Sequence, residues 1–112
     1  MLRGQGNMCQ IGDPIAIIEV PKSKPLTGWR EWSFHGGRLA GRFRNQYTWK
    51  RLGENKAKGR IRLRGEHGLW AFFKARSVVG YKHGNIEAWG QVVIHQHGFR
   101  AEYARITRLR SS

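Results

Sequence analysis

Cysteine is almost absent from this sequence. Cys9 is the only one, so the chain cannot form an intramolecular disulfide, and a zinc site built from thiolates would lack its partners. This usage is typical of a reducing compartment. We therefore expect a cytoplasmic protein.

Long apolar runs are absent as well. The most apolar stretch near the N-terminus, IAIIEV at residues 15–20, is flanked by Pro14 and Pro21 and contains Glu19. It is far shorter than the roughly 20 residues that span a bilayer, and it does not match the apolar core of a signal peptide. The sequence predicts a soluble chain with no membrane partner.

Acidic residues are scarce. The chain has 7 Asp and Glu against 21 Lys and Arg, a formal net charge of +14. Because like charges on a small domain repel one another, this excess favours an anionic partner nearby. Nucleic acid is the most common partner of this kind, and an acidic protein is an alternative.

Aromatic side chains and glycine are plentiful. Five Trp, three Tyr, five Phe and 15 Gly among 112 residues predict one domain with a packed core and many tight turns. We expect a mainly β fold, a small twisted antiparallel sheet or partial barrel with at most one short helix. Residues 1–27 are expected to form a flexible N-terminal segment and linker with a short strand at 15–20. Residues 28–112 are expected to form a single compact β-rich domain.

Turn signals divide that domain into strands. WREWSF and RLAGRF flank HGG, and NIEAWGQVVIHQ and FRAEYARITRLR flank a turn at 97–98, so each pair predicts a hairpin. QYTWKRL and RIRLR predict further strands, the second because its apolar residues alternate with arginine. GLWAFFKARSVVGY fits either a strand and turn or a short helix.

Positive charge is concentrated between residues 38 and 64, where only Glu54 is acidic. The ten basic residues there are Arg38, Arg42, Arg44, Lys50, Arg51, Lys56, Lys58, Arg60, Arg62 and Arg64. All of them except Arg38, together with Tyr47, are our candidate nucleic-acid-binding residues. Cations contact phosphates and aromatic rings stack on exposed bases. The alternative is that Arg60, Arg62 and Arg64 are the solvated face of an ordinary strand.

A second candidate site lies in the C-terminal hairpin and consists of Trp89, His95, Arg100 and Glu102. His95 and His97 have the spacing of two ligands on one strand face, but His35, His67 and His83 each neighbour a glycine and fit turns better than a third ligand position. Arg100 and Glu102 share a face and could form an ion pair. No nucleophile–base pair, phosphate loop or dinucleotide motif is present, so we predict no catalytic residue, metal or cofactor and no enzymatic activity. An enzyme built around His95, Arg100 and Glu102 is the remaining alternative, which requires these side chains to line one cleft.

The C-terminal half resembles a group of small, largely uncharacterised proteins of actinobacteria and their phages. The pattern of that group runs Gly-Ile-Tyr-Ala, Trp-Gly-x-Val and His-Glu-x-Gly-Tyr-Arg-Ala-Glu-Tyr-Ala. The matching stretches here are GLWA at 68–71, WGQV at 89–92 and HQHGFRAEYA at 95–104, with GWREWSFHGGRLAG resembling the group's opening strands. Gln96 replaces the usual glutamate, and KAKGRIRLRGEHG stands where the group often has cysteines. The resemblance implies a compact domain of a mobile-element type and no transferable activity.

Sequence-specific signatures are missing: there is no zinc-finger spacing, basic zipper, paired aromatic RNA-recognition motif or GXXG loop. We therefore expect a nucleic-acid-binding module that contacts phosphates with low sequence specificity, and the sequence leaves DNA or RNA and single or double strand open. The alternative is a phage- or mobile-element-type protein-interaction module, an inhibitor or assembly factor that docks on an acidic or ribonucleoprotein partner.

Overall fold

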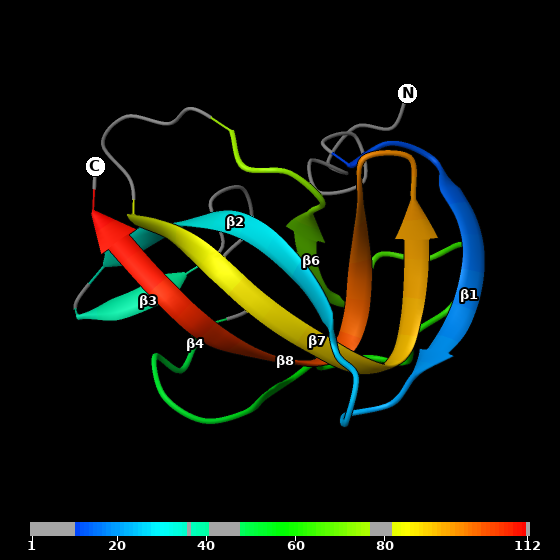
Figure 1. The fold of residues 1–112 in the computed structure, drawn as a ribbon, viewed down its shortest axis with the longest axis horizontal. Coiled ribbons are helices and arrows are strands. Elements are labelled where there is room, and N and C mark those ends of the chain that lie inside the picture. The colour runs from blue at the N-terminus through cyan, green and yellow to red at the C-terminus, as the bar shows by residue number, and fades with distance from the viewer. Residues whose placement is uncertain (1–10, 36, 41–47, 77–81, 112) are drawn as a thin grey trace.

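The protein folds as one antiparallel sheet (Figure 1). The computed structural model describes residues 11–35, 37–40, 48–76 and 82–111, and no helix lies wholly within them. The strands in this part are β1 (Pro14–Val20), β2 (Leu26–His35), β3 (Arg38–Ala40), β4 (Thr48–Trp49), β5 (Asn55–Lys56), β6 (Leu69–Phe72), β7 (Lys82–His95) and β8 (Gly98–Ser111). The expected mainly β, antiparallel fold is confirmed. Nothing helical among these residues has the length and apolar character needed to cross a membrane.

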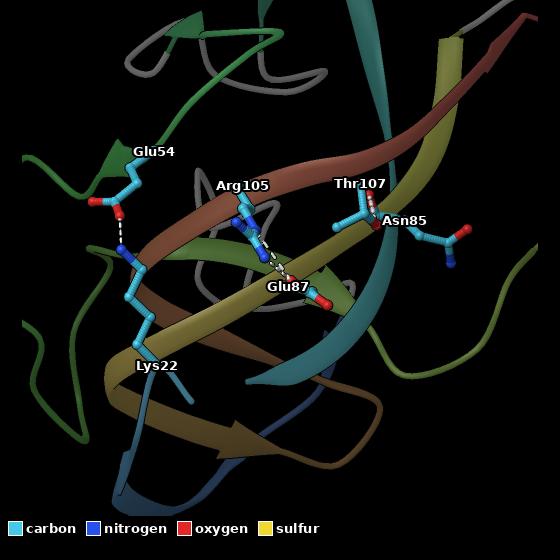
Figure 2. Close-up of polar contacts among 6 residues, drawn as sticks. All are labelled: Lys22, Glu54, Asn85, Glu87, Arg105 and Thr107. Atoms are coloured by element: carbon cyan, nitrogen blue, oxygen red, sulfur yellow. Dashed lines mark hydrogen bonds and ion pairs between the residues drawn. The ribbon is translucent and has the colours of Figure 1, made fainter. Parts of the chain in front are cut away.

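The β7–β8 hairpin is the longest element pair. Its strands pair from Lys82↔Ser111 to Ile94↔Phe99, and the turn consists of Gln96 and His97, one residue earlier than predicted. Polar cross-strand contacts lie along its outer face (Figure 2). Glu87 Oε1 accepts hydrogen bonds from Nε and Nη2 of Arg105 at 3.1 and 2.8 Å. The alternation of the hairpin therefore places the Glu87–Arg105 pair on its outer face.

The sheet closes on itself through β7. This strand pairs with β2 along its first half and with β8 along its whole length, while β6 joins β8 to β2 through the Trp29↔Phe72 pair. The four strands therefore form a ring, the partial barrel that we expected as one form of the fold. Its main core is fully buried at Trp32, Phe99 and Ile86.

The first strand of the described residues belongs to the sheet. The predicted strand at 15–20 is present as β1, which pairs with the second half of β7 and buries Val20. A turn with a hydrogen bond from the Lys24 N–H to the Pro21 carbonyl leads directly into β2. The expected boundary at 27/28 falls inside β2, so residues 26 and 27 belong to a strand, and only residues 21–25 connect β1 to β2.

The region of the basic stretch contains fewer strands than predicted. RIRLR forms no strand: residues 57–68 run as an irregular loop after β5, although Ile61 is buried and the three arginines are exposed. QYTWKRL is reduced to β4 in its described part, residues 48–52. Within GLWAFFKARSVVGY, residues 69–72 form a strand rather than a helix, because β6 pairs with β8 from Leu69↔Ala101 to Phe72↔Gly98. Residues 77–81 of this stretch lie outside the described residues.

Candidate nucleic-acid interface

The first candidate site is a cleft of about 530 Å³ at the end of the molecule where β3 and β4 lie, on the left in Figure 1. We call it the Phe34 cleft. It is lined by Phe34, Gly37, Arg38, Leu39, Trp49, Lys50, Arg51, Lys82 and Leu109.

Strand pairing explains why these residues meet. Leu39 of β3 lies opposite both Phe34 of β2 and Trp49 of β4 in the register. Leu39 and Trp49 are buried in the core, whereas Phe34 is 54% exposed. Lys82 begins β7 beside Trp32 of β2, and its Nζ lies 5.1 Å from the centre of the Phe34 ring. The cleft therefore has an exposed aromatic ring at its edge and an apolar floor.

The charge of this cleft is of one sign. Arg38, Lys50, Arg51 and Lys82 are basic, and none of the described residues that line it is acidic. Lys50 and Arg51 were predicted, and Arg38 belongs to the same basic stretch. Phe34 and Lys82 were missed. The only sequence signal for Phe34 was its place beside the predicted HGG turn, and Lys82 gave none, because β7 carries it to the site from far along the chain.

A second, smaller cleft of about 340 Å³ combines residues of both predicted sites. We call it the Lys56 cleft, and it is lined by Lys56, Ala57, Gly59, Arg60, Ile61, Gln91 and Glu102. Glu102 of β8 is hydrogen-bonded both to the segment after β5 and to β7. Its carbonyl accepts from the Ala57 N–H at 2.8 Å, and its Oε1 accepts from the Gln91 N–H at 3.1 Å. Gly90 makes the bulge in β7 possible, because its φ is +87° and a Cβ there would lie 2.7 Å from Glu102 Oε1.

The Trp89 ring packs against the side chains of Tyr103 and Lys22. Its ring stacks on its register partner Tyr103 at 6.0 Å and 10°. The ammonium of Lys22 lies 5.2 Å from the Trp89 ring, and that of Lys56 lies 5.7 Å from the Tyr103 ring. Lys22 also forms an ion pair with Glu54 (Figure 2). Because the Trp89 ring is nearly buried, it packs within the fold and presents little surface to the predicted second site.

His95 and Arg100 lie inside the fold. Arg100 Nε donates to His95 Nε2 at 2.9 Å. The other nitrogens donate to carbonyls of the loop after β5: Nη1 to His67 at 2.7 Å, and Nη2 to Arg62 at 2.9 Å and Leu63 at 3.0 Å. A buried guanidinium thereby fixes the loop that carries the predicted basic row.

His95 is neutral in this network. Burial lowers its pKa below the ordinary value, a hydrogen bond to the Gly12 carbonyl at Nδ1 opposes this, and the nearby Arg100 guanidinium lowers the pKa further. Asp13 raises it. Because Nε2 accepts from Arg100, the ring proton lies on Nδ1.

The predicted second site does not form a single cleft. Glu102 lines the Lys56 cleft, but His95 and Arg100 are fully buried. The expected partner of Arg100, Glu102, is engaged by Gln91, while Arg100 points to His95 and the loop carbonyls. Within the described residues no three His, Cys, Asp or Glu side chains are grouped as metal ligands. His83 lies inside β7 against the Trp29 ring, so its interpretation as a turn residue is wrong.

The predicted basic residues divide between the two clefts. Arg38, Lys50 and Arg51 line the Phe34 cleft, and Lys56 and Arg60 line the Lys56 cleft. Lys58, Arg62 and Arg64 are exposed but line neither. Arg42, Arg44 and Tyr47 lie outside the described residues. The prediction that Arg60, Arg62 and Arg64 form a single row on a strand is therefore wrong, because that segment is a loop.

A buried cation lies behind the Phe34 cleft. The guanidinium of Arg30 lies 4.4, 4.7 and 5.4 Å from the ring centres of Trp70, Trp49 and Trp32, and Nη1 donates to the Trp70 carbonyl at 2.9 Å. Burial lowers the pKa of Arg30 to about 9, with Glu31 opposing this, so the group stays charged at neutral pH. Trp49 thus separates a buried positive charge from the cleft.

A third cleft of about 530 Å³ lies near the β7–β8 turn and serves as the comparison for the other two. We call it the Phe73 cleft, and it is lined by Phe72, Phe73, Lys74, Arg76, Gln96 and His97. Phe73 is 41% exposed, and Arg76 lies 4.7 Å from the Phe72 ring. It holds two Lys or Arg side chains where the Phe34 cleft holds four.

Comparison of the chain with protein families, with curated proteins and with solved structures finds no match.

Proposed function

We propose that this protein binds nucleic acid, chiefly through phosphate contacts and with low sequence specificity. The observation that carries the proposal is the Phe34 cleft, where four basic side chains and an exposed aromatic ring meet without an acidic residue among the described lining. Backbone phosphates attract such a set of cations whatever the base sequence.

The Lys56 cleft supports the same function more weakly. Lys56 and Arg60 add two cations, but Glu102 lines the same cleft and repels phosphate. The net charge of +14 adds long-range attraction that steers a polyanion toward the protein. The Phe34 cleft is therefore the principal proposed contact, and the Lys56 cleft is a second, separate one.

Binding should be measured by fluorescence anisotropy with labelled 20-nucleotide single strands and 20-base-pair duplexes across a salt series. Four neutralised phosphates on duplex DNA give a slope of log affinity against log salt of about −3.6, and six give about −5.4. Absence of binding to either form at low salt, or a slope near zero, would contradict the proposal.

Two matched double variants locate the interface. Lys50→Ala with Arg51→Ala removes two charges from the Phe34 cleft, and Lys74→Ala with Arg76→Ala removes two from the Phe73 cleft. The first is expected to weaken binding to every sequence about equally and to reduce the salt slope by about 2, and the second to have a much smaller effect. The reverse ranking would place the interface at the Phe73 cleft.

A second candidate function has one observation in its favour. β1 ends the strand order and exposes Ile15, Ile17 and Ile18. An edge strand with apolar side chains can pair with a strand of another protein. This fits a mobile-element-type interaction module with an acidic or ribonucleoprotein partner. A stoichiometric protein partner that survives nuclease treatment favours this function, whereas a nuclease-sensitive excess of absorbance at 260 nm favours nucleic-acid binding.

A further inference from the structure

From the geometry of the Phe34 cleft we infer that the bound nucleic acid is single-stranded there, with an unpaired base stacked on Phe34 and its flanking phosphates held by the surrounding cations. This inference rests on the proposed function and adds the strand state and the base contact. Either DNA or RNA supplies this chemistry.

The first argument is the exposure of Phe34. The Phe34 residue is 54% exposed at the edge of a cleft, so its ring is accessible to a ligand, and covering it would remove apolar surface from water. Its register neighbour Leu39 is buried, so the ring is not needed to fill the core. A nucleobase face is a suitable cover, because base–aromatic stacking tolerates any sequence.

The second argument is the arrangement of charge around the ring. Lys82 Nζ lies over one face of the Phe34 ring, 5.1 Å from its centre, so a stacking base takes the opposite face. Arg38, Lys50 and Arg51 line the same cleft. A nucleotide stacked on Phe34 would therefore have cations within reach of the phosphates on both sides of its base. Phosphate contact without base stacking would not require the aromatic ring.

The third argument is the shape of the site. A volume of about 530 Å³ lies in the range of sites that enclose small molecules, so the cleft can admit a nucleotide. In a duplex the base faces are covered by their neighbours, and an aromatic ring at the edge of a cleft cannot stack on them unless the base leaves the stack. Duplex would then contact the rim cations only.

The test uses the full chain with a 20-nucleotide oligothymidylate, the matching oligouridylate and a 20-base-pair duplex at one low salt concentration. Phe34→Ala is expected to lower affinity for the single strands about 5- to 150-fold, the loss of one base stack, and to change duplex affinity less than about twofold. Phe34→Trp should retain single-strand affinity. Phe73→Ala, which truncates the exposed ring of the Phe73 cleft, is the matched control and should change neither.

Three outcomes overturn the inference: Phe34→Ala that weakens single strand and duplex equally, Phe34→Ala that weakens neither, or wild-type protein that binds duplex more tightly than both single strands. In each of these the proposed function still stands, because salt-dependent binding persists. Absence of binding by the wild-type protein to any of the three nucleic acids would instead contradict the proposed function.

A photo-crosslink from 5-iododeoxyuridine in the single strand, mapped by mass spectrometry, gives a readout that needs no variant. A crosslink at Phe34 supports the inference, and one only at Phe73 overturns it. The relative affinity of the two single strands identifies DNA or RNA as the source.

Discussion

Arg100 donates a hydrogen bond from Nε to Nε2 of His95 at 2.9 Å, and both side chains are fully buried. The imidazole accepts from Arg100 on one side and contacts the Gly12 carbonyl on the other. A protonated ring would turn its Nε2–H toward the Nε–H of Arg100 and place two positive charges in contact. The network therefore requires a neutral His95.

The free energy of unfolding should fall as the pH drops below about 6.5. Burial lowers the native pKa of His95 below its unfolded value of about 6.5, so between the two values the unfolded chain binds more protons. The stabilisation by neutral His95 is fully present above about pH 6.5 and is lost as pH falls toward the native pKa. Urea unfolding at pH values from 7.5 to 5 measures this decline.

The matched variant is His95→Gln, whose amide can accept from Arg100 and donate to the Gly12 carbonyl but does not titrate. The decline in stability between pH 7.5 and 5 should be smaller in this variant than in the wild type. An identical decline in both proteins would mean that other groups cause the acid sensitivity.

Arg100→Lys should destabilise the protein and loosen the loop after β5. Lysine cannot reproduce the fork of donors that reaches the carbonyls of Arg62, Leu63 and His67, and these carbonyls would lose their partner inside the fold. We expect a loss of about 2 to 3 kcal/mol in urea unfolding, from buried carbonyls left without a donor. Amide hydrogen exchange measured by mass spectrometry should increase within residues 59–68.

Arg105→Lys is the control for this change. Arg105 is exposed on β8 and pairs with Glu87 across the hairpin (Figure 2), so its replacement should cost under about 1 kcal/mol. Equal losses in the two variants, or unchanged exchange in the loop after Arg100→Lys, would contradict the anchoring role of Arg100.

The same anchor explains why the strand predicted at RIRLR does not form. The alternation of apolar and basic residues reproduces which side chains are buried, since Ile61 is inside and Arg60 and Arg62 are outside. Whether such a segment forms a strand, however, depends on which groups form hydrogen bonds with its backbone N–H and carbonyl groups. Here the side chain of Arg100 takes the carbonyls that a neighbouring strand would otherwise use. No local pattern contains that information.

Throughout the fold, features set by a short stretch of sequence were predicted, whereas those that depend on pairing between distant segments were not. The β7–β8 hairpin was predicted to within one residue at its turn, because the alternation and a glycine next to the turn lie within one short stretch. The closure of the sheet through Trp29↔Phe72 and the pairing of β1 with β7 join segments far apart in the chain. The Phe34 cleft combines both cases: the basic stretch was visible in the sequence, whereas Lys82 arrives only through the pairing of β7 with β2.

Gly84→Ala should be strongly destabilising. Gly84 of β7 lies between Arg30 of β2 and Leu109 of β8 in the register, and a Cβ there would lie 1.8 Å from the Arg108 carbonyl oxygen. Because that atom is backbone, the strands must separate. We expect a loss of about 3 kcal/mol, or more than about 10 °C in Tm. Gly65→Ala in the loop, whose nearest heavy atom would be 3.6 Å away, should leave Tm nearly unchanged. A tolerated Gly84→Ala would show that the strands are not this close.

Glu102→Gln should strengthen nucleic-acid binding if the Lys56 cleft extends the interface. Glutamine can still accept the hydrogen bond from the Gln91 N–H, while the negative charge beside Lys56 and Arg60 is removed. Relief of one repulsion near a bound phosphate is worth about 0.6 kcal/mol in water, so affinity at low salt should rise about threefold. The gain should disappear at high salt, where such interactions are screened. The anisotropy titrations described above measure both effects.

Glu87→Gln is the control that separates an effect of the local charge in the Lys56 cleft on binding from an effect of the net charge of the protein. Glu87 lies on the outer face of β7, paired with Arg105, and lines neither the Phe34 cleft nor the Lys56 cleft. It changes the net charge by the same unit as Glu102→Gln. A gain confined to Glu102→Gln assigns the Lys56 cleft to the interface. Equal gains in the two variants would mean that the polyanion responds only to total charge, and the interface would then be the Phe34 cleft alone.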